Sequence, residues 1–197
     1  MPEPTTIVFV RHGMTDTVGR TLAGRTPGVH LNAEGQRQAD DLARRLADRS
    51  FAAIYSSPLE RARETATPLA AAARLEVRIA DGATEVDFGD WTGRTMSELE
   101  TDPRWRAFNT ARSVTAPPGG ESMLDVQTRI VRALLELRSA HKGRTIAIVS
   151  HGDVIRAAIC YFAGIPIDLC QRIEIRPASI STVQVWDDWI LVTGVNG

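Results

Sequence analysis

Two short apolar runs, each followed directly by a histidine and a glycine, constrain this sequence more than any other feature. One run, Ile7–Val10, leads into the triplet Arg11–Gly13, and the other, Ile146–Val149, leads into Ser150–Gly152. Continuous runs of this kind, rich in β-branched residues, are typical of strands buried on both faces of a parallel sheet. Because ligands of such sheets bind beyond the carboxyl ends of the strands, we expect both histidines at one ligand-binding edge.

The rest of the chain alternates between helical and extended patterns. Helices are predicted after Asn32, Ser57 and Ser122, which have the character of N-caps, and Ser57–Glu60 has the form of a capping box. A further helix is predicted to run to about Ala163, and further strands at 52–55, at 75–79 and in the tail from 173 to 192. This order predicts an α/β fold, a three-layer α/β/α arrangement around a mostly parallel sheet with an antiparallel edge strand.

The length of 197 residues favours a single domain. The less regular segment at about 86–120 is expected to be a cap or lid inserted into that domain, with one or two short helices. We expect substrate specificity to reside in this cap and in the loop 19–30. Five residues are candidates for the wall of the substrate pocket, although packing explains each of them equally well: Arg25, Trp91, Trp105, Arg106 and Phe108.

Composition and charge exclude several classes of protein. Hydrophobic residues make up 43% and charged residues 24% of the chain, as in ordinary globular proteins. The formal net charge of -1 argues against a nucleic-acid partner. No apolar run approaches the roughly 18–20 residues that cross a bilayer, and the first residues lack the features of a signal peptide. We therefore expect a cytoplasmic protein with no membrane association, in which Cys160 and Cys170 are reduced core thiols.

Two further charged residues are expected beside the histidines. Arg61 falls in the first turn of a predicted helix, where the helix dipole disfavours a cation unless an anionic ligand offsets the cost. Glu85 follows the weak strand at 75–79, although several other acids surround it and spacing alone does not select it. Either histidine alone is explained by a half-buried residue at a strand end. The pair of histidines, flanked by Arg11, favours a binding site.

Two imidazoles and two guanidiniums beside an acid are typical of a site for a compact anion. Phosphate fits best, because guanidinium groups bind its oxygens in bidentate fashion and keep their charge. The histidines alone are too few to ligate a metal, and the arginines would repel a cation. We expect no metal and no cofactor.

A series of short motifs runs in order from Val8 to about Gly164: Arg11–Gly13 with Thr15, Leu31–Gly35, Ser56–Leu59 with Arg61 and Thr65, Glu85 with Phe88–Trp91, Pro118–Ser122 and Val149–Gly152. With these motifs in this order, the sequence resembles the histidine phosphatase superfamily, also called phosphoglycerate mutase-like. The loop Leu22–Gly28 further resembles a branch whose members are labelled probable phosphomutases.

The resemblance implies a metal-independent phosphatase that hydrolyses a small phosphorylated metabolite, a phosphate monoester, through a phosphohistidine. By resemblance, His12 is the nucleophile and Glu85 is the proton donor to the leaving group. The same resemblance makes Arg11, Arg61 and His151 catalytic through their hold on the phosphoryl oxygens. The implied substrate-binding residues are Arg11, Thr15, Gly24, Arg61, His151 and Gly152.

One departure from the family pattern and two alternative functions stay open. Many members carry an asparagine where this chain has Val18, so Thr15 or Thr17 would have to supply the missing donor. A phosphomutase would use the same phosphohistidine, but the short chain and the segment Phe88–Trp91 favour hydrolysis. A non-catalytic sensor of phosphorylated ligands is the least favoured, because His12 and the other implied catalytic residues are retained.

Exposed Trp and Ile side chains expected in the C-terminal strands would permit a homodimer.

Overall fold

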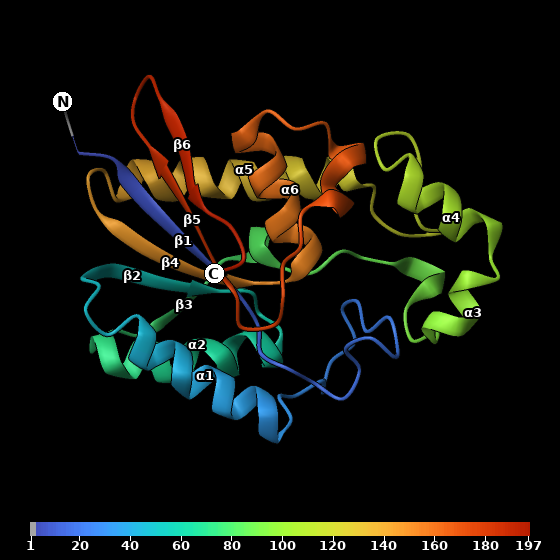
Figure 1. The fold of residues 1–197 in the computed structure, drawn as a ribbon, viewed down its shortest axis with the longest axis horizontal. Coiled ribbons are helices and arrows are strands. Elements are labelled where there is room, and N and C mark those ends of the chain that lie inside the picture. The colour runs from blue at the N-terminus through green and yellow to red at the C-terminus, as the bar shows by residue number, and fades with distance from the viewer. Residues whose placement is uncertain (1–2) are drawn as a thin grey trace.

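In the computed structural model, which describes residues 3–197, six strands form one sheet in the order β3-β2-β4-β1-β5-β6 (Figure 1). β1 to β4 are mutually parallel, β5 pairs antiparallel with β1, and β6 pairs antiparallel with β5. The predicted mostly parallel sheet with an antiparallel edge is confirmed. The strands are β1 (Thr5–Arg11), β2 (Phe51–Ser56), β3 (Val77–Ile79), β4 (Thr145–Ser150), β5 (Ile180–Val185) and β6 (Ile190–Gly194).

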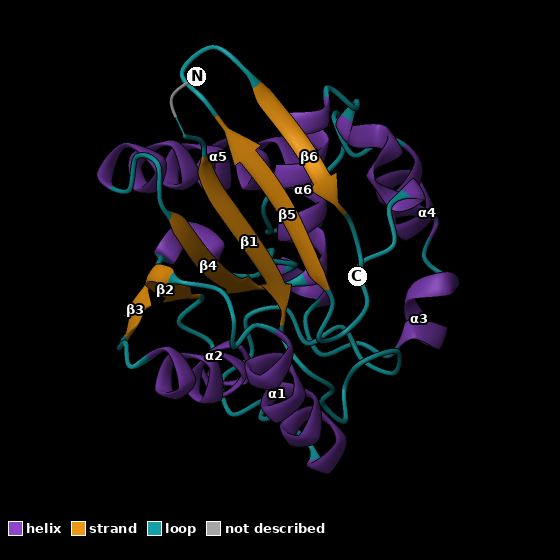
Figure 2. Cartoon of the chain, turned by 60° about the vertical axis from the view of Figure 1, so that its left-hand side comes forward, coloured by secondary structure: helices purple, strands orange, loops and turns teal. Residues whose placement is uncertain are grey.

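Helices cover both faces of the sheet, as Figure 2 shows, and the predicted three-layer arrangement is confirmed. One pair, α1 and α2, packs on one face, and the pair α5 and α6 packs on the other (Figures 1 and 2). Short 3-10 segments, η1 to η3, connect some of the elements. The helical elements are α1 (Ala33–Arg45), α2 (Glu60–Ala73), η1 (Asp81–Ala83), η2 (Gly89–Trp91), α3 (Met96–Glu100), α4 (Pro103–Thr110), α5 (Met123–Ala140), α6 (Gly152–Ala163) and η3 (Ile167–Arg172).

Alternate residues of β1 enter two separate hydrophobic cores. Val8 and Val10 pack in the core that contains Leu42 of α1 and Leu69 of α2. Phe9, which points to the opposite face, packs in the core shared with α5 and α6. Burying each such side chain stabilises the fold by roughly 1.5–3 kcal/mol. The apolar run of β1 is continuous because both of its faces are covered.

The N-caps predicted at Asn32 and Ser122 are confirmed. The Asn32 side chain accepts a hydrogen bond from the backbone N–H of Gly35 at 2.9 Å. Ser122 forms a capping box with Asp125, in which each side chain accepts from the other residue's backbone N–H. These local signals determine where α1 and α5 begin, because they satisfy N–H groups that have no partner inside the helix.

The capping box predicted at Ser57 is wrong. α2 begins at Glu60, and Leu59 occupies the N-cap position without a side-chain cap. The backbone N–H of Ser57 donates instead to the carbonyl of Val149 at 2.9 Å, which keeps this residue attached to the end of β4. A local capping signal is therefore overridden by a contact with a distant strand.

The tail is extended over a shorter range than predicted. Residues 173–179 form an irregular segment that passes the end of β1, and the strand begins only at Ile180. In this segment the carbonyl of Ile175 accepts a hydrogen bond from Nη1 of Arg11 at 2.7 Å. The weak strand predicted at 75–79 is also shorter, since β3 begins at Val77.

The segment at about 86–120 contains η2, α3 and α4, which lie to one side of the sheet (Figure 1). The loop after β1 is joined to this segment by two backbone hydrogen bonds. The N–H of Leu22 donates to the carbonyl of Arg94 at 2.9 Å, and the N–H of Gly93 donates to the carbonyl of Leu22 at 2.9 Å. The expected short helices are thus present, and their action as a cap stays a prediction. Within residues 3–197, no helix has both the length and the hydropathy to cross a membrane.

Candidate active site

The two histidines follow neighbouring parallel strands and lie side by side. In the β1–β4 pairing Arg11 is opposite Ser150, and the backbone N–H of His12 donates to the Ser150 carbonyl at 3.0 Å. The imidazole rings of His12 and His151 have their centroids 5.1 Å apart. Only 4% of His12 and 0% of His151 is exposed to solvent. The parallel pairing of the strands therefore places both imidazoles at one sheet edge.

A cavity of about 390 Å³ opens at this edge, between the carboxyl ends of the strands and the helices α3 and α4. His151 is not among the residues that line the cavity, but its ring lies next to that of His12, which is. The other predicted site residues all line the cavity: Arg11, His12, Thr15, Gly24, Arg61, Glu85 and Gly152. The fold thus gathers the predicted site residues at one place.

Among residues 3–197, the ring of His12 is held through one nitrogen, and the other makes no hydrogen bond. Its Nδ1 lies 2.8 Å from the carbonyl oxygen of Gly13. Because a carbonyl only accepts hydrogen bonds, Nδ1 carries the hydrogen of the neutral ring and Nε2 keeps a lone pair. Burial, with Arg61 and Arg11 nearby, lowers the pKa of His12 to about 3. At neutral pH this side chain is an uncharged imidazole with a basic nitrogen.

Three buried nitrogens around His12 have no hydrogen-bond partner among residues 3–197: the donors Nε of Arg11 and Nη1 of Arg61, and the ring nitrogen Nδ1 of His151. The other ends of the guanidiniums are anchored, since Arg11 donates to the Ile175 carbonyl and Arg61 Nη2 donates to the Gly24 carbonyl at 2.8 Å. A buried donor without a partner costs roughly 1–3 kcal/mol. Two such guanidinium donors beside one imidazole are typical of a site built to receive an anion.

The remaining predicted binding residues support this site in different ways. Oγ1 of Thr15 lies 2.8 Å from Oγ1 of Thr17, so two hydroxyls line the cavity next to Val18. The Gly24 carbonyl fixes the Arg61 guanidinium. Gly152 lines the cavity beside the Arg11 guanidinium, since a Cβ there would lie at an ordinary contact distance of 3.5 Å from the Arg11 Cζ.

Glu85 is distinguished from the neighbouring acids by its surroundings. Its Oε1 accepts from the backbone N–H of Val86 at 2.9 Å, and its Oε2 lies 3.8 Å from Nδ1 of His151. Burial and the charge of Asp153 raise the pKa of Glu85 to about 7. By contrast, Asp90 is exposed. Glu85 is therefore an acid that keeps its proton near neutral pH.

The cavity wall also contains an ion-pair network that sequence reasoning missed. Arg112 is only 1% exposed, and its Nη1 lies 3.3 Å from Oδ1 of Asp153. The same oxygen accepts from Nη1 of Arg156 at 2.9 Å. Burial opposes the ionisation of Asp153, but the two arginines outweigh it and hold its pKa below its ordinary value.

Only part of this network had a signal in the sequence. Asp153 and Arg156 are three residues apart at the start of α6, so helical spacing after the second His-Gly pair places them together. Arg112 lies in the irregular stretch after α4, where no periodicity points to it. Nε of Arg112 has no hydrogen-bond partner within residues 3–197.

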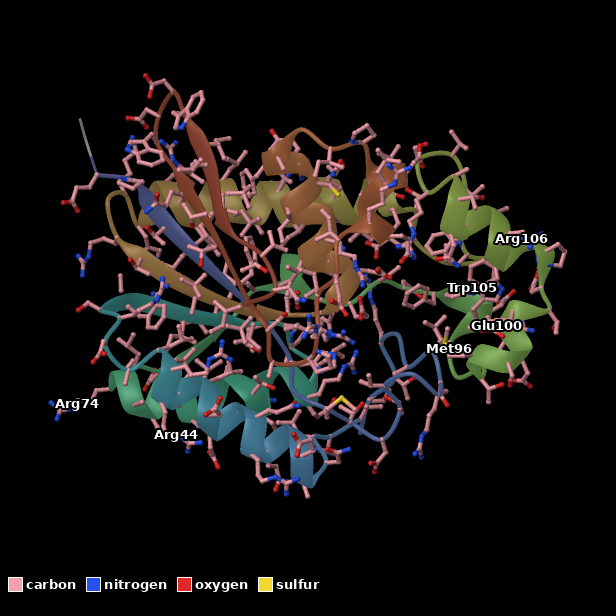
Figure 3. All side chains as sticks on the ribbon, in the orientation of Figure 1. Arg44, Arg74, Met96, Glu100, Trp105 and Arg106 are labelled. Atoms are coloured by element: carbon pink, nitrogen blue, oxygen red, sulfur yellow. The ribbon has the colours of Figure 1, made fainter. Side chains whose placement is uncertain are left out.

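The candidate wall residues are divided between the cavity and the core. Trp105 lines the cavity, as does Met96, and Figure 3 shows both on the short helices α4 and α3. Trp91 and Phe108 are 0% exposed and form an aromatic core with ring centroids 5.6 Å apart. The remaining two do not line the cavity: Arg25 pairs with Glu121 at 2.9 Å, and Arg106 is exposed.

A larger and shallower hollow of about 890 Å³ lies on α5 next to Tyr161 of α6. It is lined mainly by residues of α5, and its charged side chains are Arg132 and Glu136. Nothing there resembles the convergence of buried donors around His12. Within residues 3–197, no group of three or more His, Cys, Asp or Glu side chains is arranged to hold a metal ion.

Residues 7–196 match the family model of the histidine phosphatase superfamily (branch 1). The chain belongs to this superfamily. The resemblance stated from the motifs is confirmed, since the match spans both His-Gly pairs and the segment between them.

Among curated relatives of this superfamily member, the bifunctional protein Rv2228c of Mycobacterium tuberculosis is 37% identical over 94% of this chain and 51% of its own length. The chain therefore spans about half the length of that relative. Phosphoserine phosphatase 1 of Hydrogenobacter thermophilus is 32% identical over 91% of this chain and 86% of its own. The relatives also include a probable phosphoglycerate mutase.

Solved structures agree with these relatives. Mycobacterial glucosyl-3-phosphoglycerate phosphatase Rv2419c superimposes with a TM-score of 0.90 and 27% identity, over 99% of this chain and 100% of that protein. The match confirms the fold. One curated relative, phosphoserine phosphatase 1, and this solved structure are both named as phosphatases.

Proposed function

We propose that this chain is a metal-independent phosphatase that hydrolyses a small phosphate monoester through a phosphohistidine at His12. One observation carries the proposal: Nε of Arg11, Nη1 of Arg61 and Nδ1 of His151 are buried without a hydrogen-bond partner among residues 3–197, and they surround an imidazole whose Nε2 keeps its lone pair. A tetrahedral phosphoryl group would supply acceptors for these donors and place its phosphorus in front of the nitrogen. Guanidinium groups suit this task, because they present fixed pairs of donors and keep their charge.

In the first step, Nε2 of His12 attacks phosphorus and forms an N–P bond while the ester P–O bond breaks. The electron pair of that bond goes to the leaving oxygen, which takes the proton of Glu85. Arg11 and Arg61 neutralise the charge that develops on the phosphoryl oxygens, so catalysis consists mainly of positioning and electrostatic stabilisation. The raised pKa of Glu85, about 7, keeps this proton available at neutral pH.

In the second step, water attacks the phosphohistidine. The Glu85 carboxylate, formed in the first step, accepts a proton from this water as the O–P bond forms. The N–P bond breaks and its electron pair returns to Nε2 of His12, which regenerates the neutral imidazole. Inorganic phosphate leaves, and Glu85 is again protonated. One carboxyl thus serves as acid and then as base.

The charge of the cavity indicates what the leaving group carries. When Glu85 is protonated, Asp153 is the ionised carboxyl among the lining side chains. Four arginines line the same cavity: Arg11, Arg61, Arg112 and Arg156. A phosphate monoester dianion balances two of the three surplus positive charges, so a leaving group with one carboxylate near Arg112 would balance the third. Glucosyl-3-phosphoglycerate, named in one solved structure, carries a carboxylate with no opposing charge and would supply this third negative charge. Phosphoserine, named in one relative, carries its carboxylate together with an ammonium group, so it could pair with Arg112 locally but adds no net charge.

The proposal is tested with a panel of phosphate esters that includes phosphoserine and p-nitrophenyl phosphate, assayed in the presence of a chelator. We expect the native protein to release phosphate and His12→Ala to release none. His30 is at the end of the loop 19–30 but does not line the cavity, and its exposed side chain pairs with Glu64, so His30→Ala is expected to retain full activity. Turnover that persists in His12→Ala, or that the chelator abolishes, would refute the proposal.

Two further measurements distinguish hydrolysis from the alternatives. Rapid quenching should trap a phosphoenzyme that is labile in acid and stable in base, as a phosphohistidine is, whereas a sensor would form none. A phosphomutase, which is named among the relatives, would exchange isomers in the presence of a bisphosphate primer and release little phosphate. We expect release of phosphate without a primer.

The expected partners follow from the same proposal. A small phosphorylated metabolite is the expected substrate, and the absence of a nucleic-acid or membrane partner stays a prediction. Homodimer formation also stays a prediction: Trp189 is 63% exposed and Leu191 of β6 is 44% exposed, so apolar surface lies at the sheet edge. The cytoplasmic location is likewise a prediction.

A further inference from the structure

Ser57 occupies an unexpected position beside the second histidine. It follows β2, which is adjacent to β4, and its hydroxyl Oγ lies 2.8 Å from Nε2 of His151. Neither residue has any solvent-exposed surface. Ser57, which was predicted to cap a helix, is thus in direct contact with His151 of the candidate active site.

The hydrogens around this contact can be assigned from the available partners. Oγ of Ser57 accepts from the backbone N–H of Leu59, at 3.3 Å. Within residues 3–197, the only other group at hydrogen-bond distance from this hydroxyl is Nε2 of His151. If the imidazole donated to the serine, the buried hydroxyl hydrogen would have no acceptor, which is costly. The hydroxyl therefore donates, and Nε2 of His151 accepts.

This assignment determines the form of the His151 ring. Burial lowers the pKa of His151, and the nearby His12, Arg61, Arg11 and Arg129 lower it further, so the ring is neutral. A neutral imidazole that accepts at Nε2 carries its hydrogen at Nδ1. Nδ1 has no hydrogen-bond partner within residues 3–197 and lies 3.8 Å from Oε2 of Glu85.

We infer that Ser57 is a positioning residue, whose hydroxyl holds His151 in the tautomer that presents an Nδ1–H donor to the phosphoryl group. This role rests on the proposed function, although the tautomer itself does not. In the other tautomer, Nδ1 would present a lone pair to a phosphoryl oxygen, and an attraction would become a repulsion. Ser57 would touch neither substrate nor nucleophile and would act through His151 alone.

The tautomer is measured first, in the protein without substrate. Long-range ¹H–¹⁵N correlation spectra distinguish Nδ1–H from Nε2–H, and the loss of signals in His151→Asn assigns the resonances. We expect Nδ1–H in the native protein and a shift toward Nε2–H in Ser57→Ala. A native ring protonated at Nε2, or an unchanged spectrum in Ser57→Ala, would overturn the inference.

The kinetic test separates positioning from general stability. With p-nitrophenyl phosphate, Ser57→Ala should lower kcat by about 10- to 100-fold, as expected for a lost hydrogen bond to a charged group. Ser57→Cys, which keeps the size and a weak donor, should recover part of the rate. An altered tautomer with unchanged kcat would overturn the positioning role.

Ser150→Ala is the matched control. Ser150 is also a buried serine, but its hydroxyl donates to the backbone carbonyl of Ala83 at 2.7 Å and not to an imidazole. We expect it to lower the unfolding temperature while the Nδ1–H signal of His151 remains. If His12→Ala proved active, the proposed function would fail while the tautomer result would stand, so the two failures are distinguishable.

Discussion

Oε2 of Glu85 lies 3.8 Å from Nδ1 of His151, so the candidate acid is next to the histidine proposed to bind the phosphoryl oxygens. In the proposed mechanism a phosphoryl oxygen would bind at His151 while the ester oxygen takes the proton of Glu85. The two side chains come from separate parts of the chain, the segment after η1 and the end of β4. Their proximity leads to the first two predictions, which concern the proton of Glu85.

Glu85→Gln should lower kcat more for esters whose leaving group needs a proton than for esters whose leaving group does not. An alkoxide needs a proton in order to leave, so kcat for phosphoserine should fall by roughly 10²–10⁴-fold. 2,4-Dinitrophenol leaves as a stable anion, and its phosphate ester should lose far less. Initial rates with both esters measure the difference. Asp90→Asn, which removes a nearby exposed carboxylate, should leave both rates unchanged. Equal losses for the two esters would exclude Glu85 as the proton donor.

The raised pKa of Glu85 also predicts how stability depends on pH. The folded protein keeps the proton up to a pH of about 7, whereas the unfolded chain releases it near the ordinary pKa of 4.5. Between these values the folded state binds more protons, so the contribution of Glu85 to the unfolding free energy is fully present below pH 4.5 and is lost as the pH rises through 7.

Glu85→Gln removes this titration and should therefore become increasingly stable, relative to the native protein, as the pH rises from 5 to 8. The difference should reach ~3 kcal/mol, from 1.36 kcal/mol for each unit of pKa. Urea unfolding at several pH values measures it. Parallel curves for the two proteins would show that Glu85 titrates equally in the folded and unfolded states.

A third prediction concerns the backbone that holds His12. Gly35 packs against the segment after Gly13, and a Cβ at this glycine would lie 2.1 Å from the Met14 carbonyl oxygen. Gly35→Ala should push α1 away from the backbone that anchors Nδ1 of His12. We expect a loss of about 1–3 kcal/mol in unfolding free energy, as for other overpacked sites, together with a fall in kcat.

Gly194→Ala serves as the comparison for that substitution. A Cβ at Gly194, in the edge strand β6, would meet nothing within 4 Å. Thermal unfolding and phosphatase assays of both variants should separate them clearly. If Gly35→Ala matched Gly194→Ala in both stability and rate, the close approach between α1 and the Gly13–Met14 backbone would have no role in holding His12.

The sheet and the paired histidines could be predicted because their signals are local. A continuous β-branched run identifies a buried strand, and parallel neighbours bring their carboxyl ends to the same edge. His12 and His151 therefore meet although most of the chain separates them. Glu85 was selected among several acids by resemblance, and only the packing around it shows why Asp90, which is exposed, differs.

The residues that sequence reasoning missed act through long-range contacts. Ser57 carries a valid local signal for a helix cap, but a hydrogen bond to a histidine 94 positions away decides its orientation. Trp91 and Phe108 were candidates for the pocket wall and are core residues, because aromatic spacing alone does not tell which side of a short helix is covered. Arg112, in an irregular segment, has no periodicity that could reveal its burial.

The last prediction concerns the leaving group. Arg112 is buried in the cavity wall, pairs with Asp153 and has an Nε without a partner among residues 3–197. Arg112→Met keeps the length of the side chain and removes its charge. If Arg112 binds the carboxylate of the substrate, kcat/KM for phosphoserine should fall by about 10- to 100-fold, from the roughly 1.5–3 kcal/mol of a hydrogen bond to a charged group. The loss should appear mainly in KM.

This experiment has one control for phosphoserine and one for Arg112→Met. p-Nitrophenyl phosphate has no carboxylate, so its kcat/KM should change little in Arg112→Met. Arg106→Met removes an exposed arginine of α4 outside the cavity and should leave both esters unaffected. An equal loss for both esters in Arg112→Met would mean that Arg112 holds the phosphate end or supports the fold through Asp153, and that a carboxylate is not what it recognises.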